Sequence, residues 1–256
     1  MITERFMIPG PKGRLQAILQ LPDGFDRTRD RCTVVILMHG IMPNPVTIPL
    51  PHFARALVNS GFAALRFFFY GNWGSDGTNE EVTVPGEIED ARAVYRLVRS
   101  WPFAEKVVLL GHSQGGVVAG MLAGMLQQEA APPDALILLS PGAVLKDYAR
   151  EGRLFGLRVD PENPPERKRV LWYTIGRDYI LTAQTLPIYE TSALYTGPVC
   201  ICHGTIDRIV PFRYSERYAE GYADCRLNPI RGANHFYSFR RRRVDALLLA
   251  FLRARL

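Results

Sequence analysis

The sequence predicts an α/β fold in which helices cover both faces of a mostly parallel, twisted sheet. Three observations support this prediction. Short apolar runs alternate along the chain with segments whose apolar residues recur at helical spacing. Several of these runs are almost continuously apolar and end at glycine, which is typical of strands buried on both faces. With 256 residues, of which 47% are hydrophobic and 22% charged, the chain can bury one sizeable core.

The N-terminal part predicts a hairpin followed by a strand–helix–strand unit. Segments 5–9 and 14–22 flank the turn Gly-Pro-Lys-Gly and have the character of paired strands. Segments 32–40 and 62–71 are buried-strand runs. The intervening segment 51–61 has helical spacing and ends on a glycine, a common helix stop.

The central part continues the alternation. It predicts a helix over 87–101, a strand over 106–111, a helix over 115–129 and a strand over 135–142. After a long gap, a further strand is expected at 198–204. Parallel strands joined by helices in this way form a sheet that is covered on both sides.

The C-terminal part predicts a helix over 214–222, a strand over 225–230 and a final helix that starts beside Arg240–Arg243. These four arginines carry much of the formal net charge of +6. We interpret them as a solvated helix face and not as a nucleic-acid site, because no nucleic-acid-binding fold accompanies them. Basic residues at a helix N-terminus oppose the helix dipole.

One stretch, residues 143–195, breaks the alternation and is far longer than the usual connection of ~2–6 residues. Because ligands bind beyond the carboxyl ends of parallel strands, we interpret it as a lid over a core made of 1–142 and 196–256. The alternative is a structural excursion that packs its aromatic side chains on itself. The aromatic residues of this stretch include Tyr148, Phe155, Trp172, Tyr173, Tyr179 and Tyr189.

The segment Gly-His-Ser-Gln-Gly, residues 111–115, matches the nucleophile-elbow pattern, with Ser113 at its centre. It lies between a predicted strand and a predicted helix, as the mechanism requires. A sharp turn there crowds its neighbours, so that only glycine fits at Gly111 and Gly115. The turn lifts the hydroxyl clear of the sheet, and Ser113 is therefore our candidate nucleophile. A serine that merely caps a helix is the structural alternative.

A serine hydroxyl needs a neighbouring base, which in turn needs an acid to orient it. In folds with such a turn the acid and then the histidine follow the serine along the chain. We assign Asp207, just past a predicted strand end, as the acid and His235 as the base. His203 precedes this acid, Asp178 lies in the expected lid, and Asp224 opens a strand at the opposite edge. The alternatives are a turn aspartate and a solvated loop histidine.

An oxyanion that develops during acyl transfer needs two preorganised donors. The N–H of Gln114, directly after the candidate nucleophile, is one. The loop after the strand 32–40 should supply the other from Ile41, with His39 and Gly40 shaping the turn.

Composition indicates where this chemistry takes place. No run approaches the ~18 consecutive apolar residues of a membrane span, and the N-terminus has no basic segment followed by an apolar one. We therefore expect a cytoplasmic protein with reduced cysteines and with no membrane or nucleic-acid partner.

Cys200 and Cys202 alternate in a predicted strand. We expect them to be buried thiols and not to bind a metal together with His203. Neither a metal nor an organic cofactor is expected, and a homodimer is one of the assembly states left open.

With these residues in place, the chain resembles the α/β-hydrolase family, and within it the bacterial cinnamoyl (feruloyl) esterases, over most of its length. The motifs that carry the resemblance are EIEDARAV, GHSQGGVVAGMLAG, LPIYETSA, PVCICHGTIDRIVP and GANHF. The resemblance implies an α/β-hydrolase fold with an inserted lid. It implies a triad of Ser113, Asp207 and His235, with Ile41 and Gln114 as oxyanion donors.

The resemblance also implies that lid residues touch the phenolic end of the acyl group. In the family pattern an aspartate and a glutamine meet ring hydroxyls, but Tyr148 and Phe155 stand at those positions here, and only the tyrosine, Tyr179, is retained. We expect these three residues, with His39 at the rim, to contact the substrate. Aromatic walls select shape more than hydroxyl pattern, so the expected acyl group is bulky or aromatic.

The activity expected from these features is that of a serine carboxylesterase acting on a small-molecule ester through an acyl-enzyme. A thioesterase, a lactonase or a short-chain lipid esterase on the same triad are alternatives. A ligand-binding or regulatory protein on the same fold, which turns over little or nothing, is the alternative from another class.

Overall fold

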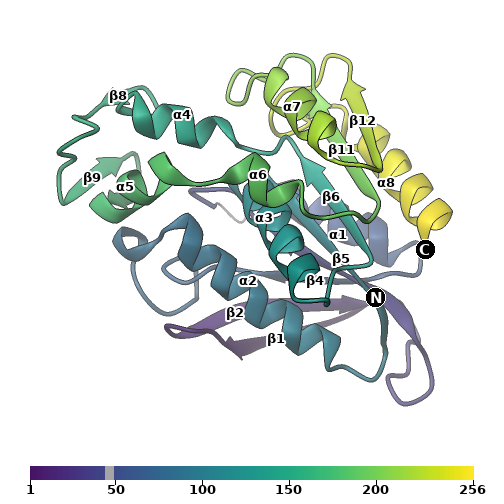
Figure 1. The fold of residues 1–256 in the computed structure, drawn as a ribbon. Coiled ribbons are helices and arrows are strands. Elements are labelled where there is room, and N and C mark those ends of the chain that lie inside the picture. Colours follow the sequence, from purple (N-terminus) through teal and green to yellow (C-terminus); the bar gives the residue numbers. More distant parts are fainter. Residues whose placement is uncertain (44–48) are drawn as a thin grey trace.

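An eight-stranded sheet runs through the molecule in the computed structural model, which describes residues 1–43 and 49–256 (Figure 1). Its strand order is β1-β2-β4-β3-β5-β6-β11-β12. The first two strands form an antiparallel hairpin that pairs antiparallel with β4, and the other strands are parallel to one another. The strands are β1 Ile2–Pro9, β2 Arg14–Leu21, β3 Cys32–Met38, β4 Ala63–Phe67, β5 Ala104–His112, β6 Ala135–Leu139, β11 Val199–Gly204 and β12 Cys225–Ile230. The predicted fold class is confirmed.

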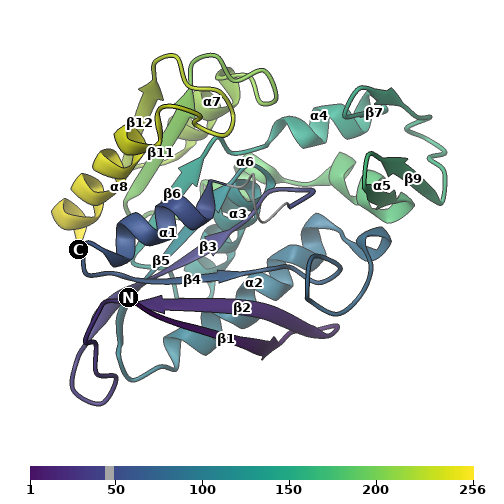
Figure 2. The same ribbon diagram turned by 180° about the vertical axis from the view of Figure 1, so that it is seen from behind.

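Helices cover both faces of this sheet. One face carries α1 (Leu50–Val58) and α8 (Arg241–Arg255), which lie together in Figure 2. The other face carries α2 (Val84–Arg99), α3 (Gln114–Gln128) and α7 (Arg213–Gly221). The predicted helices and strands of the core are all present.

The continuous apolar runs are explained by this double covering. In β3, Val35 and Leu37 pack toward the α1 and α8 side, whereas Ile36 and Met38 pack toward α2 and α3. All four side chains are fully buried. A strand with two buried faces has no position at which a polar residue would reach water, so its sequence shows no alternation.

The segment between β6 and β11 leaves the sheet at its carboxyl end. It contains α4 (Val144–Arg150), a hairpin of β7 (Arg153–Leu154) and β8 (Leu157–Arg158), a hairpin of β9 (Arg167–Val170) and β10 (Tyr173–Gly176), and helix α5 (Arg177–Thr185). In Figure 1 these elements project beyond the sheet.

The chain then returns through α6 (Ile188–Ser192), which packs closely on α3. A Cβ atom at Gly124 would lie only 1.9 Å from the carbonyl oxygen of Thr191. A short 3₁₀ helix, Asn79–Glu81, precedes α2.

Two sequence-based expectations concern the cysteines and the membrane. Cys200 and Cys202 are fully buried free thiols in β11, which confirms their assignment to the core. No helix within residues 1–43 and 49–256 combines the length and the apolar character that crossing a membrane requires.

Two members of the Arg240–Arg243 cluster turn back toward the loop that precedes α8. The Nε group of Arg240 donates to the carbonyl of Arg231 at 3.4 Å, and that of Arg241 donates to the carbonyl of Phe236 at 3.5 Å. The cluster therefore holds carbonyl groups of the loop that carries His235.

Candidate active site

Ser113 stands on a sharp turn between β5 and α3. Its backbone has φ 57°, a left-handed conformation that is costly for a residue with a Cβ atom. Steric contacts explain the two glycines of the motif. A Cβ atom at Gly111 would lie 2.0 Å from the carbonyl oxygen of Gly115, and one at Gly115 would lie 2.4 Å from that of Met38. The pattern is thus dictated by close backbone approach.

The loop after β3 passes directly against this turn. A Cβ atom at Gly40 would lie 2.8 Å from the Cβ atom of Ser113. The next residue, Ile41, lines the same cavities as Ser113. Gln114 is the first residue of α3, so its N–H has no acceptor within the helix. The N-terminus of a helix also favours negative charge.

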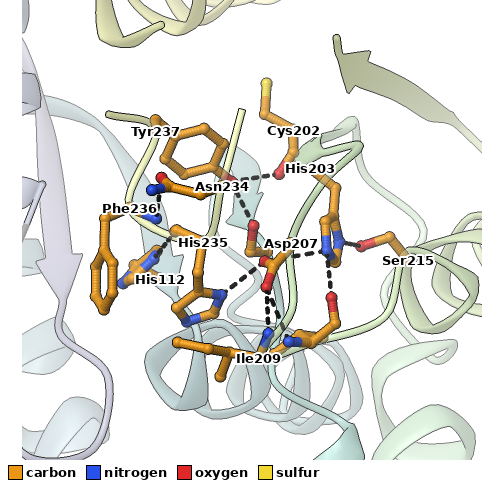
Figure 3. A network of polar contacts seen from close by, with 12 residues as sticks. His112, Cys202, His203, Asp207, Ile209, Ser215, Asn234, His235, Phe236 and Tyr237 are labelled. Carbon is orange, nitrogen blue, oxygen red and sulfur yellow. Dashed lines mark hydrogen bonds and ion pairs between the residues drawn. The ribbon is translucent and has the colours of Figure 1, made fainter. Parts of the chain in front are cut away.

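Asp207 lies in the loop after β11, and its carboxylate points toward His203 and His235 (Figure 3). Its side chain is fully buried. One carboxylate oxygen, Oδ1, accepts the backbone N–H groups of Ile209 and Val210, each at 2.9 Å. The other, Oδ2, lies 2.7 Å from Nδ1 of His235. Two backbone N–H groups of the loop and the imidazole of His235 thereby set the position of this carboxylate.

Burial raises the pKa of Asp207, but hydrogen bonds from His203 and His235 outweigh burial and hold that pKa well below its ordinary value. The carboxylate is therefore ionised throughout the physiological range. An ionised acceptor requires that Nδ1 of His235 carry a proton. In the neutral ring Nε2 is then the unprotonated nitrogen, which can act as a base.

His203 is a second histidine on the same carboxylate. It is fully buried, and its Nε2 atom lies 3.3 Å from Oδ2 of Asp207 and 2.9 Å from the carbonyl oxygen of Val210. Its Nδ1 atom lies 2.6 Å from Oγ of Ser215. Because a carbonyl can only accept, Nε2 carries the proton and Nδ1 accepts from the serine hydroxyl.

His235 lies in the loop between β12 and α8 and is 4% exposed. His112 donates from Nε2 to the His235 carbonyl at 2.9 Å, and the side chain of Asn234 accepts the N–H groups of Phe236 and Ser238. Burial, followed by the nearby His235, lowers the pKa of His112 to about 3, so this ring stays neutral. Side chains on both sides of His235 therefore fix its backbone.

Two cavities meet at the nucleophile turn. The smaller, of about 190 Å³, is lined by Ser113, His235 and Ile41, among others. The larger, of about 420 Å³, extends from Ser113 and Gln114 under the projecting segment. Three predicted contact residues, Tyr148, Phe155 and Tyr179, line the larger cavity.

His39 is placed differently from our expectation. It is 2% exposed and does not line either of these cavities within the described residues. Both ring nitrogens have backbone partners, since Nδ1 donates to the carbonyl of Gly40 at 2.8 Å and Nε2 accepts the N–H of Phe69 at 3.2 Å. Burial lowers its pKa to about 4, which keeps the ring neutral. His39 supports the turn from beneath and does not contact substrate at the rim.

The Gln114 side chain joins the projecting segment to the core. Its Oε1 atom accepts the hydroxyl proton of Tyr179 on α5 at 2.7 Å, and its Nε2 atom donates to Glu87 on α2 at 2.7 Å. All three side chains are buried. Burial raises the pKa of Glu87 to about 8, with Asp90 adding to the effect and the Gln114 hydrogen bond opposing it. At neutral pH this carboxyl is therefore protonated.

Glu87 makes the stability of the protein depend on pH. Between pH 4.5 and about 8 an unfolded chain releases the Glu87 proton while the folded protein keeps it. Stability conferred by this site must then fall as the pH rises, by at most about 1.4 kcal/mol per pH unit. We expect Glu87→Gln, which keeps an acceptor for Gln114 and cannot ionise, to gain stability relative to the parent protein between pH 5 and pH 8.

Urea unfolding of both proteins at the two pH values measures this difference. The exposed Glu105 serves for the matched change Glu105→Gln. A stability difference between Glu87→Gln and the parent that is the same at both pH values would contradict the buried, protonated carboxyl.

Sequence reasoning missed His112, His203 and Glu87 as supports of the site. The signal for His203 was its place at the end of a buried strand, four residues before the acid. A loop that makes one turn over these four residues brings the carboxylate back beside the histidine. Nothing local marks Glu87, which lies within a helix.

No group of three or more His, Cys, Asp or Glu side chains within residues 1–43 and 49–256 is arranged to hold a metal ion.

The comparisons with known proteins concern the family and the fold of the chain. A family model described as serine aminopeptidase, S33, matches residues 29–161, a range that includes the nucleophile turn. Human protein ABHD12B is 27% identical over 192 residues, covering 75% of this chain and 50% of that protein. The chain thus spans about half the length of this curated relative.

Among solved structures, Est1E from Butyrivibrio proteoclasticus with ferulic acid bound superposes with a TM-score of 0.90 at 29% identity, covering 98% of each chain. A serine hydrolase without a lid from Xanthomonas campestris superposes with a TM-score of 0.67 at 21% identity, covering 98% of this chain and 94% of the other. This second likeness concerns the fold alone.

Proposed function

This chain belongs to the serine aminopeptidase S33 family of α/β-hydrolases, and on that premise we propose that it is a serine carboxylesterase for aromatic or bulky acyl esters. The observation that carries the proposal is the buried Asp207–His235 pair at 2.7 Å beside the cavity lined by Ser113 and His235. A buried carboxylate that orients an imidazole next to a strained, accessible serine is the arrangement that nucleophilic catalysis requires.

The proposed reaction proceeds through an acyl-enzyme. Ser113 Oγ attacks the carbonyl carbon of the ester while Nε2 of His235 takes its proton. Asp207 stabilises the imidazolium that forms. His235 then returns the proton to the departing alcohol. A water molecule, deprotonated by His235, attacks the acyl-enzyme and regenerates the serine.

The tetrahedral intermediate carries its negative charge on the former carbonyl oxygen. We propose that the N–H groups of Ile41 and Gln114 receive this charge at the N-terminus of α3. Each such donor contributes about 3 kcal/mol to the lowering of the barrier in comparable enzymes. The Glu87–Gln114–Tyr179 chain of hydrogen bonds supports the position of the second donor.

The larger cavity supports the choice of acyl group. Its volume of about 420 Å³ is within the range for small-molecule sites, and it leads away from Ser113 between aromatic side chains. Est1E, which is structurally similar over 98% of both chains, is described with ferulic acid bound. We therefore assign the acyl group to this cavity, with Tyr148, Phe155 and Tyr179 as its contacts and residues 143–195 as the lid.

Reaction with an alkyl fluorophosphonate tests the proposal. We expect one equivalent to attach to Ser113, as located by peptide mass spectrometry. The fraction of activity lost should equal the fraction of protein that is labelled. Heat-unfolded protein is the control, because the serine is activated only in the folded site. Absence of labelling in the folded protein would instead favour a ligand-binding member of the fold.

A substrate panel then ranks the bonds that are cleaved. We expect 4-nitrophenyl cinnamates to be cleaved faster than thioesters, lactones and short-chain lipid esters. An amino-acid 4-nitroanilide is included because the matching family model is described as a serine aminopeptidase. Faster cleavage of the anilide than of every ester would overturn the assignment to ester bonds.

A further inference from the structure

The wall of the larger cavity is positively charged. Three arginines line it, namely Arg153, Arg158 and Arg208. None of the lining residues that the structure describes is acidic. The remaining lining side chains are mostly apolar, including Val144, Leu145 and Leu154. A ligand that fills this space meets an apolar surface with cationic groups and no anionic group of the protein.

Two of the three arginines are not neutralised by the protein. Arg153 is paired with Glu151 at 3.1 Å and lies over the ring of Tyr148, with its guanidinium carbon 4.7 Å from the ring centroid. Among the described residues, no carboxylate comes within 4.0 Å of the guanidinium of Arg158 or Arg208. Within the part of the chain that the structure describes, no ion pair balances the positive charge of these two arginines.

Three of the acids that are close along the chain are engaged elsewhere. Asp160, two residues after Arg158, accepts the backbone N–H of Glu162 with Oδ1 at 3.0 Å. Asp207, adjacent to Arg208, directs both carboxylate oxygens inward, to His203, His235 and two backbone N–H groups. Asp147, in helix α4, accepts a hydrogen bond from the hydroxyl of Tyr214. None of these three acids is paired with Arg158 or Arg208.

The two arginines approach the cavity from different parts of the fold. Arg158 belongs to strand β8 of the projecting hairpin, whereas Arg208 directly follows the acid of the proposed triad. Ser113 lines the same cavity. An acyl group that starts at Ser113 and follows the apolar wall can therefore place a distal anionic group near one or both guanidinium groups.

We propose that the preferred substrates are esters whose acyl group has an apolar body and ends in an oxyanion, a carboxylate or a phosphonate-like group, bound by Arg158 and Arg208. This inference rests on the proposed esterase function. The guanidinium group is permanently charged and can donate two parallel hydrogen bonds to a planar carboxylate, which makes arginine well suited to this role. Both side chains are exposed at the cavity, so the attraction is screened by salt.

The test uses 4-nitrophenyl esters of three cinnamic acids that differ only at the para position. One carries a carboxylate, one a phosphonate and one a neutral carboxamide of nearly the same size as the carboxylate. We expect kcat/KM for the better anionic ester to exceed that for the carboxamide by at least about 10-fold at low salt, mainly through KM. This ratio should fall as sodium chloride is added.

Two single variants and a control locate the effect. Arg158→Gln and Arg208→Gln should each reduce the anion-to-carboxamide ratio of kcat/KM several-fold. Arg226→Gln removes an exposed arginine on β12, away from the cavity, and should leave the ratio unchanged. A preference that is stronger for the carboxylate or for the phosphonate identifies which oxyanion the site takes.

Failure of the inference is distinguishable from failure of the esterase assignment. If the carboxamide ester is cleaved as fast as both anionic esters, or faster, the inference is wrong and the esterase assignment stands. If none of the three is cleaved, the esterase assignment fails, and calorimetry with the free 4-carboxycinnamate and its carboxamide decides the inference. Tighter binding of the carboxylate, lost in an Arg158→Gln/Arg208→Gln double variant, supports it; equal binding of the two acids overturns it.

Discussion

Replacing Ser113 with alanine should abolish ester hydrolysis and leave the protein folded. The proposed mechanism has no other nucleophile, and the oxyanion donors alone provide only a small residual rate. We expect kcat to fall by at least about 10⁴-fold, as in serine hydrolases with the same groups. Folding should persist because the hydroxyl makes no hydrogen bond that stabilises the turn within residues 1–43 and 49–256. The backbone hydrogen bonds from Ser113 N–H to Leu139 and from Gly142 N–H to Ser113 remain. Release of 4-nitrophenol and circular dichroism measure the two quantities.

Ser140 offers a matched control for this change. It also directly follows a parallel strand, β6, at the same edge of the sheet and has a positive φ, 44°. Its hydroxyl, however, is buried against the hydroxyl of Tyr237 at 2.8 Å. We expect Ser140→Ala to lower the melting temperature and to retain most of the activity per folded molecule. Ester turnover by the Ser113→Ala protein at a rate near that of the parent would refute the assigned nucleophile.

Replacing Asp207 with asparagine should reduce kcat by about 10³ to 10⁴-fold, by analogy with the same change in a serine-protease triad. An asparagine oxygen can still accept the N–H groups of Ile209 and Val210. Its amide group would then face His235 and donate to Nδ1. The imidazole would take the other tautomer, with a proton on Nε2, and could not accept the proton of Ser113.

This change also tests the electrostatic description of the acid. In the parent protein, Nε2 of His203 donates toward the carboxylate of Asp207. In the variant the asparagine amide would lie beside this N–H group, so two hydrogen-bond donors would face each other. We therefore expect a lower melting temperature together with the loss of kcat. Asp178→Asn, at an exposed position of α5, is the control and should leave both unchanged. A kcat within about ten-fold of the parent would indicate that Asp207 does not orient His235.

Local signals explain why most of the core could be predicted. The strands β3, β5, β6 and β11 are buried on both faces, so each is a continuous apolar run that needs no knowledge of its neighbours. Helices α2 and α3 have the spacing of a helix with one or more buried faces. The strand order could be anticipated only in outline, because register and neighbours depend on contacts between distant segments.

The segment between β6 and β11 could be delimited but not described in advance. Its two hairpins have strands of only two to four residues, which are too short to produce a periodic pattern. Burial of Tyr173 and Tyr179 and exposure of Trp172, which is 60% exposed, follow from how this segment docks on the core. Aromatic content alone does not distinguish these outcomes.

The sequence by itself determined the candidate residues for the chemistry, because a strained turn needs small neighbours and because chain order restricts which acid and which histidine can meet the serine. Only the tertiary structure decided that His39 is buried beneath the site, that Asp207 is shared by His203 and His235, and that two unpaired arginines line one cavity. The physical reason is that these facts concern side chains from loops that follow different strands. Such loops converge only when the parallel strands are assembled, and local sequence propensity does not predict where they meet.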